Sequence, residues 1–145
     1  MSKYKEVINS LLVDVFNHIL SIEEKNLKDK GVTLSMTEVH VLEAIKNTKD
    51  PSMGEVAKKL RITLGTLTTS INILVRKKHV TRFNNPSDRR KVYLKLTDNA
   101  KEVLKIHDEF HDEMIEAVFK DLNLEDDEVL MKSLENLKDY FKDKY

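Results

Sequence analysis

One stretch decides the fold of this chain, residues 63–97, which read TLGTLTTSINILVRKKHVTRFNNPSDRRKVYLKLT. From Thr63 to about Lys77, apolar residues recur at spacings of three and four, which predicts an amphipathic helix with Thr63 as its cap. The residues expected on its core face are Leu64, Leu67, Ile71, Leu74 and Val75. Residues 80–83 and 91–96 alternate in polarity around a turn-rich middle, residues 84–90, which predicts a β-hairpin. A helix followed at once by a basic hairpin is typical of a winged helix-turn-helix.

The sequence before this stretch supplies the other helices of that motif. Ser35 and Glu38 have the spacing of a capping box and predict a helix over residues 36–47. Ser52 and Glu55 repeat the spacing before a second, short helix. A link of only two residues separates this short helix from the helix that Thr63 caps, as a helix-turn-helix requires.

The two ends of the chain predict a dimerisation module. Residues 3–30 carry an apolar stripe long enough to need a partner chain as cover. Residues 97–145 predict two more helices, the second beginning near Asn123, with fifteen acids against seven lysines. The predicted fold class is mainly α with a small β-hairpin: a winged helix-turn-helix with six helices, in an intertwined homodimer. It is one domain overall, in which residues 1–30 and 97–145 form the dimerisation module and residues 35–96 bind DNA.

Charge points to the partner of the middle segment. Residues 58–95 hold eleven cations and one acid, a net charge of +10, although the whole chain is neutral. Such a patch favours a polyanion, here double-stranded DNA, over a merely solvated basic face. The chain has no cysteine, no glycine-rich phosphate loop and no nucleophile elbow, so we expect that the protein is not an enzyme. It has no membrane span or signal peptide, so we expect no membrane partner and a cytoplasmic location.

The polar face of the Thr63–Lys77 helix is lined by small hydroxyl residues, which let a helix enter the major groove. Asn72 can bind adenine with both the oxygen and the nitrogen of its side-chain amide, and the arginines of the hairpin tip suit a narrow minor groove. Asp88 is expected to orient Arg90 through a charge-assisted hydrogen bond. The residues expected to contact DNA are Thr63, Gly65, Thr66, Thr68, Thr69, Asn72, Arg76, Arg82, Asp88, Arg89, Arg90 and Lys91.

With the motif Asp88-x-Arg90 and the following Leu94-x-Leu96-Thr97, the chain resembles the MarR family of winged-helix regulators over nearly its whole length. The stretch 63–71 looks most like the repressors of fatty-acid-synthesis genes in Gram-positive bacteria. The resemblance implies a homodimeric repressor on a pseudo-palindromic operator, without a required cofactor. It further implies that an acyl chain on acyl carrier protein tightens DNA binding. The pocket for that acyl chain is expected at Phe16, Ile19, Leu20 and Met36.

One departure from the family concerns Lys78, which stands where members usually have glycine after the recognition helix. A left-handed backbone there would strain a lysine by roughly 1 kcal/mol.

A metal site is the alternative to the acyl effector. His107 and His111 lie four residues apart on one predicted helix, so both side chains face one side and can share a metal ion. The zinc-sensing members of the family place a glutamate and another histidine beside such a pair, which here implies Glu24, or its neighbour Glu23, and His40. The same histidines can instead be bonded to nearby carboxylates in a plain structural role.

Overall fold

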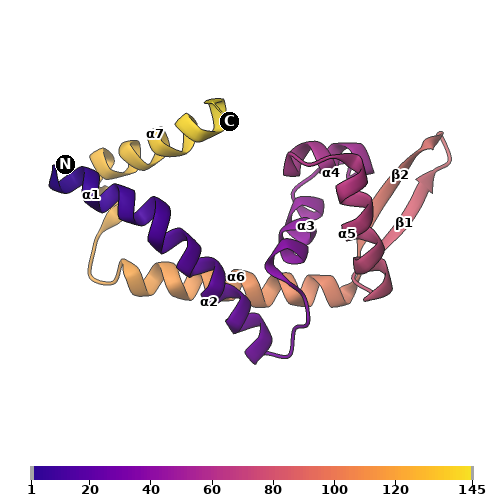
Figure 1. Cartoon of the computed structure of the whole chain (residues 1–145), viewed down its shortest axis with the longest axis horizontal. Helices are drawn as coiled ribbons and strands as arrows, with labels where there is room; N and C mark the ends of the chain where they lie inside the picture. The colour runs from indigo at the N-terminus through magenta and orange to yellow at the C-terminus, as the bar shows by residue number, and fades with distance from the viewer. Residues whose placement is uncertain (1, 145) are drawn as a thin grey trace. The chain divides into compact units, whose positions relative to one another are not determined.

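The computed structural model describes residues 2–144 and is mostly helical (Figure 1). Contacts divide the chain into two compact units, Met1–Phe110 and His111–Tyr145, and this division lies inside a continuous helix, α6 (Asp98–Val118). The described residues contain six helices, counting the N-terminal one as continuous, and a two-stranded hairpin. The predicted fold class is therefore confirmed. The assignment of residues 1–30 and 97–145 to dimerisation stays a prediction.

The predicted N-terminal helix is present with an internal irregularity. It runs through α1 (Lys3–Ser10), a π-helical segment η1 (Leu11–Val15) and α2 (Phe16–Asp29). The side-chain amide of Asn17 donates to the Val13 carbonyl oxygen at 3.0 Å, inside the widened segment. The helix ends at Asp29, and Gly31 just beyond it has a φ of 81°, the left-handed conformation that glycine adopts without strain.

The three helices of the helix-turn-helix begin at the predicted caps. Helix α3 (Met36–Lys46) has both hydrogen bonds of the capping box between Ser35 and Glu38. In α4 (Met53–Leu60) the Ser52 side chain accepts from the Glu55 amide, and in α5 (Leu64–Arg76) the Thr63 side chain accepts from the Thr66 amide. These bonds satisfy amide groups that the first turn of a helix leaves without partners.

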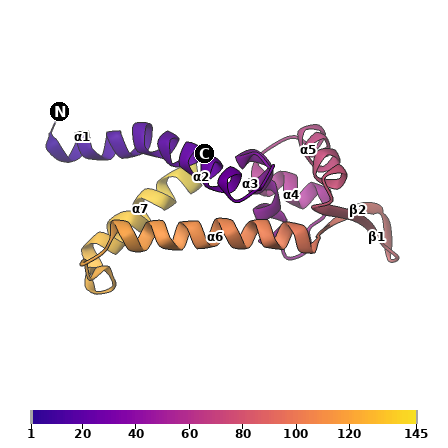
Figure 2. The same cartoon turned by 90° about the horizontal axis from the view of Figure 1, so that it is seen from below.

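The hairpin consists of β1 (Val80–Asn85) and β2 (Asp88–Leu96), paired antiparallel with Val80 opposite Leu96 (Figure 2). Both strands are longer than predicted, and the turn is only residues 86–87 instead of 84–90. A register shift between Asn84 and Asn85 explains the difference, because it lets the pairing continue to the tip. The Asn85 side-chain oxygen accepts from the Ser87 amide at 3.1 Å and closes the turn.

One apolar core holds the first unit together. It takes residues from α2, α3, α4, α5, the hairpin and the first half of α6, and its fully enclosed side chains include Leu27, Val39, Leu42, Val56, Leu67, Ile71, Leu74, Val80, Leu94 and Leu104. The recognition helix and the hairpin are thus anchored to the same core, which fixes their relative position.

The second unit contains the end of α6, a short 3-10 turn η2 (Leu124–Asp126) and α7 (Glu128–Lys144). The last helix was predicted to begin near Asn123 but begins at Glu128, because Asp127 caps it by accepting from the Leu130 amide at 2.9 Å. Its apolar side chains, among them Val129 and Phe141, are exposed in the single chain. Within residues 2–144, no helix combines the length and apolar character that a membrane span requires.

Candidate nucleic-acid interface

The recognition helix α5 has one buried and one exposed face. Leu67, Ile71 and Leu74 are fully buried, as predicted, while the threonines and Asn72 are exposed on the opposite face. Leu64 was also expected in the core, but its side chain is 55% exposed. The first turn of α5 extends beyond the core, so the prediction from periodicity was wrong at this position.

The threonine hydroxyls on α5 are oriented by the helix itself. Thr68 donates to the Leu64 carbonyl oxygen at 2.8 Å, and Thr69 donates to the Gly65 carbonyl oxygen at 3.2 Å. Because these hydroxyl protons are used within the helix, the threonines offer an oxygen acceptor and a methyl group outward. Such a surface suits the amino groups of adenine or cytosine and the methyl group of thymine.

Asn72 does not stand alone on this face. Its side-chain oxygen accepts a hydrogen bond from the guanidinium of Arg82 on β1. This contact connects the recognition helix to the hairpin directly and was not foreseen from the sequence. The expected adenine contact of Asn72 must therefore be reconsidered.

The tip of the hairpin carries three consecutive exposed cations, Arg89, Arg90 and Lys91. Asp88 accepts a hydrogen bond from the backbone amide of Arg90 at 3.1 Å, so the carboxylate fixes the Arg90 backbone. Asp88 was expected to orient Arg90, and the hydrogen bond that the structure shows between them involves the main chain of Arg90. Asn84 similarly donates to the Arg89 carbonyl oxygen at 3.2 Å. These bonds hold the tip in shape while its cationic side chains stay in solvent.

A cleft of about 600 Å³ lies between the start of α5, α4 and the hairpin. Arg82, Arg90 and Lys91 supply its positive charge, and Met53, Leu64 and Val92 supply an apolar wall that includes the exposed Leu64. Sequence reasoning missed the cleft because its wall comes from three separate elements.

All eleven cations of residues 58–95 are exposed, as a surface for DNA phosphates requires. Lys77 differs from the other cations because its ammonium group is bonded within the protein. It donates to the Glu38 carboxylate at 3.0 Å and to the Thr33 carbonyl oxygen at 3.1 Å. Lys77 therefore ties the end of α5 to the start of α3.

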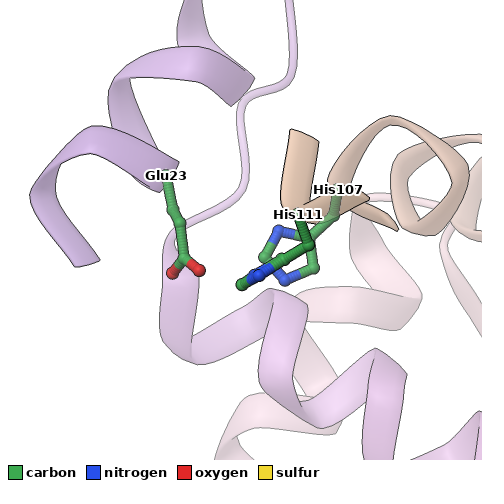
Figure 3. A group of neighbouring side chains, drawn as sticks. All are labelled: Glu23, His107 and His111. Carbon is green, nitrogen blue, oxygen red and sulfur yellow. The ribbon is translucent and has the colours of Figure 1, made fainter. Parts of the chain in front are cut away.

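Glu23, His107 and His111 lie together beside the core (Figure 3). Each offers one ligand atom, and these atoms lie within 4.8 Å of one another. The two histidines lie one turn apart on the continuous helix α6, so their proximity is local. His107 Nε2 also bonds Glu43 at 3.1 Å, and this hydrogen bond raises the pKa of His107 against the opposing effect of burial.

Of the expected metal ligands, this arrangement brings together the two histidines and Glu23, the alternative to Glu24, but not His40. The carboxylate beside the histidines is Glu23, which shares the buried face of α2 with Leu27. Glu24 is turned away by about 100° on the helix, and its carboxylate pairs with Lys28 at 3.4 Å. His40 is half-buried on α3 and is not part of the group.

The four residues expected around an acyl chain lie in different environments. Met36 is buried in the core, Ile19 and Leu20 are half-buried, and Phe16 is 59% exposed. None of the four lines the cleft beside the hairpin. The acyl pocket therefore stays a prediction.

Comparison with known proteins identifies the family to which the chain belongs. The family model described as MarR family matches residues 34–92, which contain α3, α4, α5 and most of the hairpin. A solved structure of FabT from Streptococcus pneumoniae in complex with DNA is 35% identical in sequence and covers 97% of this chain and 99% of that one, with a TM-score of 0.86. The chain belongs to the MarR family.

More distant relatives show the MarR-family fold alone. MarR of Staphylococcus aureus, solved in complex with salicylate and kanamycin, is 17% identical, covers 98% of this chain and 94% of that one, and has a TM-score of 0.77. An uncharacterised HTH-type transcriptional regulator of Bacillus subtilis, YvnA, is 18% identical over 95 residues. That match covers 63% of this chain and 60% of YvnA, less than two thirds of its length.

Proposed function

We propose that this MarR-family chain is a DNA-binding transcription repressor of the cytoplasm. One observation carries the proposal: the hydroxyl-lined face of α5 and the cationic tip of the hairpin are both exposed and are anchored to one core. A helix with this face fits the major groove, and the arginines beside it suit the flanking minor groove. The similarity to FabT, solved with DNA, supports the same conclusion.

The repressor acts as a homodimer on a pseudo-palindromic operator. In the single chain, Val7, Leu11 and Phe16 are each more than half exposed, as are Val118 and Val129 in the second unit. A soluble chain rarely leaves so many large apolar side chains in water, so a second copy is the natural cover. Two recognition helices then read half-sites about one helical turn of DNA apart.

Salt dependence of DNA binding tests this proposal. The wild type is expected to bind a duplex selected from a random library with an affinity that falls steeply with salt. Arg90→Ala should lower the steepness of the log–log slope by about 2, because each of the two subunits loses one phosphate contact. Lys132→Ala, which removes a cation on α7, is the control and should leave the slope unchanged. A flat salt titration of the wild type, or an unchanged slope in Arg90→Ala, would contradict the proposed interface.

The effector of the repressor is, we propose, an acyl chain carried on acyl carrier protein, and its targets are fatty-acid-synthesis genes. Two observations support this assignment: residues 63–71 resemble those of fatty-acid-synthesis repressors, and the chain has 35% sequence identity to FabT. Adding long-chain acyl carrier protein should tighten operator binding, while the unacylated carrier should not. Equal effects of the two carrier forms would refute it.

Zinc is the second candidate effector, because Glu23, His107 and His111 offer the ligand types that zinc prefers. Three protein ligands would leave a fourth position for water. Metal-bound histidines commonly give their other ring nitrogen to a carboxylate, and Glu43 holds that place beside His107. Calorimetric titration with zinc is expected to show one site, which His111→Ala abolishes and which His18→Ala, an exposed histidine on α2, preserves. Equal zinc binding by all three proteins would exclude this site.

A further inference from the structure

We propose that Asn72 and Arg82 act as one unit in operator recognition, in which Asn72 positions the Arg82 guanidinium and does not itself read adenine. The inference rests on the proposed function, DNA binding by α5 and the hairpin. It starts from the hydrogen bond between the two exposed side chains, which joins α5 to β1.

The direction of this hydrogen bond follows from its chemistry. A guanidinium has only N–H donors, so the amide of Asn72 must turn its oxygen toward Arg82. Recognition of adenine by asparagine needs that oxygen to accept from the base and the amide nitrogen to donate to it. While Arg82 is bound, one lone pair of the Asn72 oxygen is used and the amide is held toward β1, so Asn72 is not free to turn its oxygen and its nitrogen together to one adenine. The residue that the sequence suggested as an adenine reader is therefore a positioning residue.

Arg82 is placed to use this support. It is paired across the hairpin with Leu94, which is 1% exposed, and cross-strand partners share one face of a sheet. The Arg82 side chain consequently leaves the hairpin on the side that faces the helices. It lines the cleft together with Thr68 on α5 and Arg90 at the tip.

The hydrogen bond prepares Arg82 for binding. A free arginine side chain loses rotamer freedom when it contacts DNA, and a partner that already restricts it reduces that loss. One N–H group is used by Asn72, and the others remain for a base edge or a phosphate. Arginine suits the two acceptors of guanine, O6 and N7, so the unit is expected to favour guanine where Asn72 alone would favour adenine.

A double-mutant cycle on the full chain tests the coupling. The probe is the duplex that wild-type protein selects from a random library of roughly 30 base pairs, long enough for two half-sites. Asn72→Ala and Arg82→Ala should each weaken binding about tenfold, and the double variant should be no weaker than Arg82→Ala within about twofold. Independent contacts would multiply to about a hundredfold. The control is Arg76, an exposed cation one turn further along α5, whose loss should multiply with that of Asn72.

Base preference gives a readout that a merely structural role would not move. Selection repeated with each single variant should lose the same base preference in both, with thermal unfolding unchanged from wild type. Multiplied losses, or loss of an adenine preference in Asn72→Ala that Arg82→Ala retains, would overturn this inference alone. Failure of the wild type to select any duplex would overturn the proposed function and the inference with it.

Discussion

Replacing Lys78 with glycine should stabilise the folded chain, because the Lys78 backbone has a φ of 65°, in the left-handed region. Lys78 follows Lys77, the residue that caps the end of α5. The helix closes through two bonds: the Lys78 amide donates to the Val75 carbonyl oxygen at 3.0 Å and the His79 amide to that of Leu74 at 2.8 Å. This is the helix ending that glycine usually occupies. The structure thus shows the left-handed backbone at Lys78 for which strain was expected from the sequence.

The magnitude follows from two opposing effects. A left-handed conformation costs a residue with a side chain about 1–2 kcal/mol, which glycine avoids. Glycine loses more conformational freedom on folding, which takes back about 0.4–1 kcal/mol. The Lys78 side chain is exposed, so little packing is lost. The net gain in the free energy of unfolding is about 0.5–1 kcal/mol, which raises Tm by roughly 1–4 °C in a chain of this length.

The assay is thermal and urea unfolding at a fixed protein concentration, because a dimer's stability depends on concentration. Lys78→Ala is the matched control: it removes the charge but keeps the strain, so it should give no gain. Gly31→Ala is the reverse test at a helix end with a φ of 81°. An added Cβ there meets no atom within 4 Å, so a loss of about 1 kcal/mol measures the backbone alone. Equal stability of the glycine and alanine variants at position 78 would refute the reasoning.

Three further changes test the first unit. Leu42→Ala removes a fully buried side chain and should cost about 2–5 kcal/mol in urea unfolding, whereas a cost below about 1 kcal/mol would show a core that is not closed. Ser35→Ala breaks the capping box of α3 and should cost about 1 kcal/mol, and Thr37→Ala, exposed in the same turn, should cost less. Burial and, to a smaller extent, the positive charge of Lys77 lower the pKa of His79 from its usual 6.5. The unfolded chain therefore binds more protons than the folded chain just below that pH. Wild type should therefore lose stability relative to His79→Gln as pH falls through 6.5, and a constant difference between the two would contradict the lowered pKa.

The sequence predicted the features that depend on local patterns. The helix caps Ser35, Ser52 and Thr63 each bond the amide three residues further along the chain, so the local sequence itself contains the information. The hairpin was found for the same reason, although its turn was drawn too long. Lys78 could be singled out only because members of the family usually have glycine at this position.

The features that the sequence did not predict depend on tertiary placement. Periodicity put Leu64 in the core, but only the structure shows where the core ends. Glu23 and Glu24 are adjacent acids on one helix, and a rotation of about 100° decides which of them faces the histidines. The contact between Asn72 and Arg82 joins two elements whose distance no local pattern encodes.

The π-helical segment at Leu11–Val15 has a consequence for how the N-terminal helix can change. Such a segment holds one residue more than the α-helix would in the same length. Deleting a single residue there would let the helix become regular without breaking it. Because the π turn accommodates the extra residue within about one turn, the helix on either side would keep its phase, and Tyr4, Val7 and Ile8 would face the same direction as before. Length variation at this one point would therefore preserve the surface that the N-terminal helix presents to a second copy, whereas a deletion in a regular α-helix turns every residue before it by about 100°.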